Sequence, residues 1–148
     1  MASRQPSSHV RSMRPAEFDV NHTWLAFRAN RAPIVAGDAV ADVFVLQDAA
    51  SMFIFGAAFA SPEHDSPSEQ DVAALLQQAW DRRHEWPQEL VVSGKPSKSN
   101  SFVRVAERIG VPVRAVPEPL MSFYIKDVQS SMEEFLSGQR SDDASGSS

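Results

Sequence analysis

Residues 90–101, LVVSGKPSKSNS, are the stretch that best indicates the order of strands and helices in this chain. An apolar run of the kind that forms a buried strand stops at Gly94, and a polar loop with two lysines leads into a segment with helical spacing. A strand that passes through a short loop into a helix is the building unit of α/β sheets. The stretch therefore predicts one such unit, and the flanking sequence should supply the rest of the sheet.

Three strands are expected before this stretch. Residues 40–47 (VADVFVLQ) are rich in β-branched and aromatic side chains, and residues 52–60 (MFIFGAAFA) are the most apolar run of the chain. The intervening residues 48–51 contain Asp and Ser, which favour turns. Two strands joined so closely must be antiparallel, and residues 24–27 add a shorter strand.

Helices are indicated on both sides of residues 90–101. Ser66, followed by Pro67 and Glu69, is the expected N-cap of the first helix. A second helix is expected over residues 100–109 and ends at Gly110. The first and third helices carry apolar stripes, at Val72, Leu75, Leu76, Ala79 and Trp80, and at Ile125, Val128, Met132, Phe135 and Leu136.

The remaining strand is expected at residues 111–116, with Pro112 at its beginning or on a sheet edge. The predicted order is strand, strand, strand, helix, strand, helix, strand, helix. An antiparallel meander followed by alternating helices and strands implies an α/β (α+β) mixed sheet with helices on its faces.

Length and composition fit one domain. The chain has 148 residues, 43% of them hydrophobic and 22% charged, with a net charge of −5. We expect an arm over residues 1–20 that is basic and flexible, a domain over residues 21–137, and a disordered polar tail over residues 138–148. There is no cysteine, which excludes disulfides, thiolate metal sites and cysteine nucleophiles. No apolar run has the length that a signal peptide or membrane helix requires, so a cytoplasmic protein without a membrane partner is predicted.

Several local patterns are similar to those of the ribonuclease H-like superfamily, in particular the integrase and transposase cores. The stretch VFVLQDAASMFIFG, residues 43–56, resembles the second and third strands of that family. WPQELVVSG, residues 86–94, resembles the segment leading to its second catalytic acid, and RIGVPV, residues 108–113, its helix end and fifth strand. An uncharacterised bacterial family also shows a similar strand, turn, strand, helix and Pro-x-x-Leu strand sequence.

The resemblance implies carboxylates that converge on two Mg²⁺ or Mn²⁺ ions for phosphodiester cleavage. The first acid would fall near Ala26 or Phe27, and the second on Ser93, so neither position carries a carboxylate. The third could be Asp127 or Glu133. A shifted alignment that uses Asp42 or Asp48 as the first acid still leaves Ser93 at the second position.

The lysine loop is the other candidate site. It lies between a strand and a helix N-terminus, where backbone N–H groups attract anions, but it lacks the phosphate-loop motif and contains Pro96. Lys95, Lys98, Ser99 and Asn100 are therefore the candidate anion-binding residues, against the alternative of a surface loop whose Ser or Asn caps the next helix. No two of the four histidines have zinc-binding spacing.

These observations favour a non-catalytic ribonuclease H-like domain that acts as a macromolecular binding or accessory module. Its partner would be an unknown protein or a nucleic-acid backbone, and it would need no cofactor or metal. The alternatives are a metal-dependent nuclease or transposase-type enzyme, with Asp48 and Asp127 as weak catalytic candidates and Mg²⁺ or Mn²⁺ as its metal, or a small-anion binder at residues 94–101. A homo-oligomer, and the use of an exposed strand edge for assembly, stay open.

Overall fold

The strands form one mixed sheet. The computed structural model describes residues 12–94 and 99–132. The strands are β1 (Thr23–Arg28), β2 (Ile34–Ala36), β3 (Ala39–Asp48), β4 (Ile54–Ala60), β5 (Glu89–Ser93) and β6 (Val113–Val116). Across the sheet the order is β4, β3, β1, β5, β6, and β2 pairs with the first residues of β3. The parallel strands are β1, β5 and β6, whereas β3 runs antiparallel to both β1 and β4.

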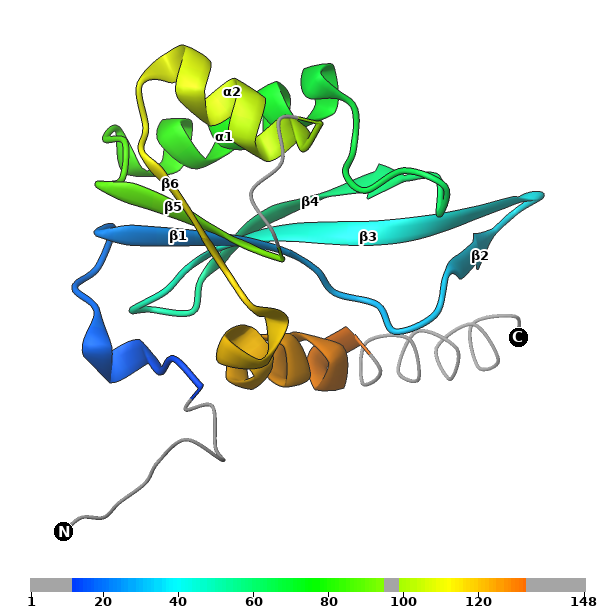
Figure 1. The fold of residues 1–148 in the computed structure, drawn as a ribbon, viewed down its shortest axis with the longest axis horizontal. Coiled ribbons are helices and arrows are strands. Elements are labelled where there is room, and N and C mark those ends of the chain that lie inside the picture. The colour runs from blue at the N-terminus through cyan, green and yellow to red at the C-terminus, as the bar shows by residue number, and fades with distance from the viewer. Residues whose placement is uncertain (1–11, 95–98, 133–148) are drawn as a thin grey trace, which may run out of the picture.

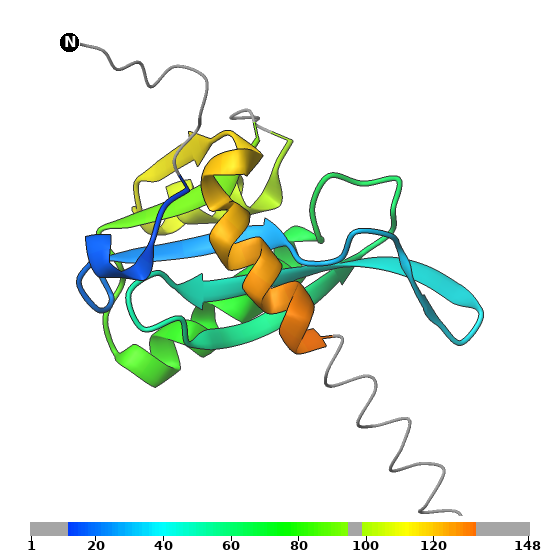
Figure 2. The ribbon, with the colours of Figure 1, turned by 90° about the horizontal axis from the view of Figure 1, so that it is seen from below.

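Within the described residues, three helices cover the two faces of this sheet. Helices α1 (Glu69–Arg83) and α2 (Ser101–Ile109) lie on one face, and a helix over residues 122–132 lies on the other (Figure 1). Seen from below, this last helix crosses the sheet diagonally, and the hairpin of β2 and the start of β3 projects beyond it (Figure 2). No helix in the described part of the chain is both long and apolar enough to cross a bilayer.

The central strand β1 is buried on both faces, which explains its unbroken apolar run. Trp24 and Ala26 belong to the core beneath α1 and α2, whereas Leu25 and Phe27 belong to the core beneath the helix over residues 122–132. The alternation follows from the two-residue period of a strand. Each core therefore uses every second residue of the same strand.

The expected fold is confirmed, with one strand added. The predicted strands at residues 24–27, 40–47 and 52–60 correspond to β1, β3 and β4, with ends shifted by at most two residues. The short strand β2 was not predicted. It forms because the turn at Gly37, whose φ is +65°, folds residues 34–36 back onto residues 39–41.

The start of α1 differs from the prediction. Its N-cap is Ser68, whose hydroxyl accepts a hydrogen bond from the backbone N–H of Asp71 at 3.1 Å. Ser66 is buried, and its hydroxyl accepts from the backbone N–H of Ser101 at 2.9 Å, while the Ser101 hydroxyl donates to the Pro67 carbonyl. Ser66 was wrong as a cap because a tertiary contact with α2 takes its oxygen.

Part of the expected N-terminal arm packs on the domain. The backbone N–H of Met13 donates to the Leu120 carbonyl at 2.7 Å, and its side chain is buried. The hydroxyl of Ser12 accepts from the backbone N–H of Phe123 at 2.9 Å. A short 3-10 helix, Pro15–Glu17, follows. Residues 1–11 of the arm, and residues 138–148 of the expected tail, lie outside the described residues.

Candidate functional site

The carboxyl ends of β1, β5 and β6 meet along one side of the sheet, which we call the carboxyl edge. Ala26 pairs with Val92, and Ser93 pairs with Val116, so the three strands end nearly level. The chain leaves β1 towards β3 on one side and leaves β5 towards β6 on the other. In α/β sheets, ligands bind at such a point of divergence, outside the carboxyl ends of the strands.

The acid positions expected from the family resemblance lie at this edge, and they hold no carboxylate. Ala26 and Phe27 are buried in the two cores on opposite faces of β1. Ser93 is half-buried at the end of β5, and the next residue, Gly94, donates its N–H to the Val116 carbonyl at 2.8 Å. The φ of Gly94 is +95°, a conformation that favours glycine.

Asp42 is the carboxylate that β3 contributes near this edge, and it is held by its neighbours. It is buried, accepts a hydrogen bond from the Asn30 amide at 3.0 Å, and lies 3.6 Å from a guanidinium nitrogen of Arg28. The Asn30 oxygen in turn accepts from the backbone N–H of Val43 at 2.8 Å. This arrangement satisfies Asp42 and fixes the path of the chain after β1.

Beyond these residues the carboxyl edge opens into a hollow of about 240 Å³ between the loop after β1 and the helix over residues 122–132. Two cations, Arg31 and Lys126, and one carboxylate, Glu118, line it. The Arg31 Nε donates to the Gln129 side-chain oxygen at 3.0 Å, which links the loop to the helix. The formal balance of these three charged groups is positive.

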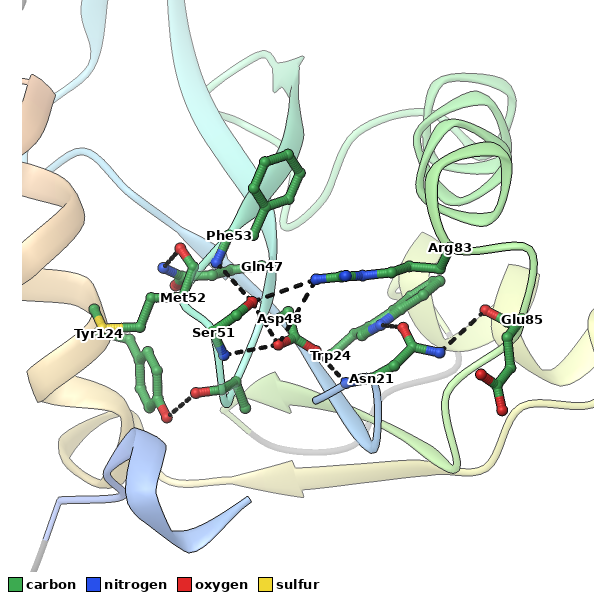
Figure 3. A network of polar contacts seen from close by, with 11 residues as sticks. Asn21, Trp24, Gln47, Asp48, Ser51, Met52, Phe53, Arg83, Glu85 and Tyr124 are labelled. Carbon is green, nitrogen blue, oxygen red and sulfur yellow. Dashed lines mark hydrogen bonds and ion pairs between the residues drawn. The ribbon is translucent and has the colours of Figure 1, made fainter. Parts of the chain in front are cut away.

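Asp48 lies at the other end of the sheet, as the last residue of β3, where the turn to β4 begins. Its partner in β1 is Trp24, near the start of that strand. The carboxylate is fully buried and accepts three hydrogen bonds of 2.7 to 2.8 Å, from the backbone N–H of Asn21 and from the N–H and hydroxyl of Ser51 (Figure 3). A guanidinium nitrogen of Arg83 lies 4.0 Å away. The contacts make Asp48 the organising residue of this turn.

The structure does not bring the two catalytic candidates into one metal site. Asp127 is exposed on the helix over residues 122–132, beside Lys126 and Ser130 in a shallow hollow. Within residues 12–94 and 99–132, no three His, Cys, Asp or Glu side chains gather where they could hold a metal ion. Glu133, the other candidate for the third acid, lies outside the described residues.

The candidate anion loop is described only in part. Lys95 and Lys98 lie outside the described residues. The Asn100 side chain accepts from the backbone N–H groups of Phe102 at 2.8 Å and Val103 at 3.3 Å, so it occupies donors that an anion at the start of α2 would need. Ser99 is exposed and lines a hollow of about 460 Å³ with Arg104 and the acidic residues of the loop before α1.

A second polar cluster ties the amino ends of the three parallel strands together. Glu89 of β5 accepts two hydrogen bonds from the guanidinium of Arg114 of β6, at 3.0 and 3.1 Å, and one from the Thr23 hydroxyl of β1 at 2.9 Å. The bonds from Arg114, more than any other contact, lower the pKa of Glu89, although partial burial opposes them. Thr23 is fully buried, so the cluster stabilises the packing of these three strands against one another.

Sequence reasoning missed Arg31 and Lys126. They lie far apart in the chain and join only because the last helix packs beside the loop after β1. The sequence did carry a partial signal, because Arg28 ends a buried strand and Arg31 lies three residues beyond it, where ligand-binding residues of α/β sheets gather.

No protein-family model matches the sequence, and no curated protein matches it. Among solved structures, the chain is similar to a chain of the simian T-cell lymphotropic virus intasome in complex with PP2A regulatory subunit B56 gamma. The TM-score is 0.56 at 16% sequence identity, over 90% of this chain and 44% of that chain. It is also similar to the HTLV-2 integrase catalytic core domain in complex with magnesium (dimeric form), with a TM-score of 0.45 and 14% identity, over 74% of this chain and 66% of that chain.

The chain thus spans less than half the length of the intasome chain that it matches. At this level of identity the likeness concerns the fold alone, and none of these findings bears on the bacterial family. The strand order β4, β3, β1, β5, β6, with helices on both faces, agrees with the likeness. The chain has a ribonuclease H-like fold of the integrase-core type.

Proposed function

We propose that this domain is a non-catalytic relative of the integrase core that binds a nucleic-acid backbone at the carboxyl edge. The observation that supports the proposal concerns the charge at that edge, where acidic groups are missing and basic groups lie nearby. Where metal-dependent enzymes of this fold class need converging carboxylates, the chain has Ala26, Phe27 and Ser93, and the neighbouring hollow has Arg31 and Lys126.

The chemistry of these groups suits phosphate contact. Arg offers a planar fork of donors and Lys a point charge, and both make the sequence-independent contacts on which backbone binding rests. Lys95 and Lys98, the candidate anion-binding lysines, follow β5 in the sequence and lie outside the described residues. The net charge of −5 confines such binding to this patch, because the rest of the surface repels a polyanion.

A paired-variant binding experiment tests the proposal. The double variant Arg31→Gln, Lys126→Gln should weaken binding of a labelled single- or double-stranded oligonucleotide by about ten-fold at low salt, and the slope of log affinity against log salt should fall by about two. Arg108→Gln is the matched control, because Arg108 is exposed on α2 and its partner Glu69 keeps a second ion pair with Arg104 at 2.6 Å. Binding that is absent in the wild type, or equal in the double variant, would contradict the proposal.

The non-catalytic part is tested separately. The wild-type protein should leave labelled DNA and RNA intact in the presence of Mn²⁺ at high protein concentration. Cleavage that Asp127→Asn abolishes would overturn this part and favour the metal-dependent enzyme. Asp127 suits this purpose because it is exposed, so its replacement should leave the fold unaltered.

A further inference from the structure

A second hollow adjoins the one that Arg31 and Lys126 line, and its walls are largely apolar. It measures about 220 Å³ and lies between the chain that joins β1 to β2 and the end of the helix over residues 122–132 (Figure 1). We call it the apolar hollow, and the earlier one of about 240 Å³ the charged hollow. Ile34 and Met132 line the apolar hollow and are only partly buried against the core, so apolar surface of both stays open to a ligand.

The side chain of Asn30 also lines the apolar hollow, but its polar atoms are already engaged. It is buried, and its amide nitrogen donates to the Ala32 carbonyl at 2.8 Å and to the Asp42 carboxylate at 3.0 Å. Its oxygen accepts from the backbone N–H of Val43 at 2.8 Å. Because no N–H of Asn30 is left for a ligand, the hollow favours apolar surface over a pattern of hydrogen bonds.

Arg31 and Gln129 line both hollows, so they stand at the junction between them. The Arg31 Nε donates to the Gln129 side-chain oxygen at 3.0 Å. Within residues 12–94 and 99–132, the two terminal guanidinium nitrogens of Arg31 and the amide nitrogen of Gln129 make no hydrogen bond, and Lys126 forms no ion pair. These donors are available to an anion, and the flat guanidinium of Arg31 can stack on a planar group.

The two hollows match the two parts of a nucleotide. The faces of a base are apolar enough to leave water for the apolar hollow, and the phosphate is an anion that Arg31 and Lys126 can bind. Pockets for drug-sized ligands measure about 300–1,000 Å³, so about 220 Å³ suits one smaller planar group. Bases of single strands commonly stack on the guanidinium plane of arginine, the group that stands at this junction.

A base can enter the apolar hollow only when it is unpaired, because in a duplex it is stacked and hydrogen-bonded between its neighbours. We propose that the apolar hollow takes one unpaired base of a single-stranded nucleic acid while Arg31 and Lys126 hold the phosphate beside it. The inference rests on the proposed function and narrows its ligand from any nucleic-acid backbone to a single strand. Recognition is tolerant of base identity, since Asn30 offers no free N–H to the base.

Comparison of strands with and without bases tests the inference. The wild type should bind a short labelled oligothymidylate about five-fold more tightly than a strand of equal length and charge whose sugars carry no base, because the base leaves water on binding. The slope of log affinity against log salt should be the same for both strands, since they carry the same phosphates. Equal affinity for the two strands would overturn the inference.

Filling the apolar hollow should remove the preference for bases. Ala32 lines this hollow and is exposed, so Ala32→Leu adds apolar bulk there without burying it in the core. The variant should bind both strands with the affinity that the wild type has for the strand without bases. Ala16→Leu, the same change at an exposed alanine that lines neither hollow, should behave as the wild type does. An Ala32→Leu protein that keeps the preference would refute the inference.

The outcomes separate this inference from the proposed function. If the double variant Arg31→Gln, Lys126→Gln weakens binding but the wild type shows no preference for bases, the proposed function stands and the inference fails. If the wild type binds neither strand, both fail. Competition is the last arm: thymidine monophosphate, or a peptide of alternating Leu and Asp, should not displace the strand at equal concentration. Displacement would assign the hollow to a free nucleotide or to a protein, and would overturn the inference.

Discussion

At the scale of single residues, Asp48 shows how a carboxylate that resembles a catalytic candidate can instead hold a turn. Two of its three hydrogen bonds come from Ser51, within the β3–β4 turn, and the third comes from Asn21, in the segment before β1. Replacing Asp48 with alanine leaves the backbone N–H groups of Asn21 and Ser51 without their acceptor and removes a buried carboxylate from beside Arg83. We expect Asp48→Ala to lower the free energy of unfolding by about 3 kcal/mol, measured by urea denaturation.

Asp127→Ala is the control for this measurement. Asp127 is exposed on a helix, so its loss should change the free energy of unfolding by less than about 0.5 kcal/mol. If the two variants were equally stable, the hydrogen bonds of Asp48 would contribute nothing net, and its assignment to the turn would be wrong.

At the scale of elements, Glu89 links three parallel strands through a charge that depends on pH. The Arg114 guanidinium is the main cause of its lowered pKa, so folding favours the ionised carboxylate. The stabilisation is present above the ordinary glutamate pKa of about 4.5 and is lost as the pH falls below it. We expect the unfolding free energy of Glu89→Gln to fall less steeply between pH 5 and pH 3 than that of the wild type.

The same variant should be less stable than the wild type at pH 7, because the amide cannot replace the charge-assisted bonds to Arg114. Glu107→Gln, at an exposed position of α2, provides the matched comparison and should follow the wild-type curve. If the unfolding free energies of the wild type and both variants followed parallel curves against pH, the contacts of Glu89 would contribute nothing to the stability of the fold.

The elements also show what a sequence can reveal and what it cannot. Strands β1, β3, β4 and β5 were predictable because each is an apolar run bounded by turn residues. The short β2 was not, since its three residues give no period and it exists only by pairing with β3. Ser66 satisfied every local rule for an N-cap, and only its tertiary contact with Ser101 moved the cap to Ser68.

The candidate site was predictable to a smaller degree than the fold. The place of Ser93 at the end of a buried strand could be predicted from the apolar run before it, because that judgement needs only local order. The pairing of Arg31 with Lys126 across one hollow could not, because it depends on how the last helix lies over the sheet. A site at the end of one strand can be located from the sequence around that strand. A site formed between a loop and a helix from another layer depends on the tertiary fold and cannot be located in this way.

At the scale of the whole molecule, the boundaries of the folding unit can be tested by truncation. Residues 12–20 contribute buried Met13, its bond to the Leu120 carbonyl, and the Ser12 bond to Phe123. Removing residues 1–20 should therefore lower the unfolding free energy by about 3 kcal/mol, from one buried Met side chain and the lost hydrogen bonds. Removing residues 1–11, or residues 138–148, should leave it within about 0.5 kcal/mol of the full chain, since both segments are polar and offer little apolar surface to bury.

Urea denaturation of the three truncated proteins beside the full chain distinguishes two descriptions of the domain. If removal of residues 1–20 has the larger effect, the folding unit begins near residue 12, because the helix over residues 122–132 uses Ser12 and Met13 to complete its contact with the sheet. If that removal has no effect, the unit begins near residue 21 and the packing of Met13 adds no net stability. A loss on removing residues 138–148 would extend the unit beyond its expected end at residue 137, and would mean that the last helix needs support from the polar tail.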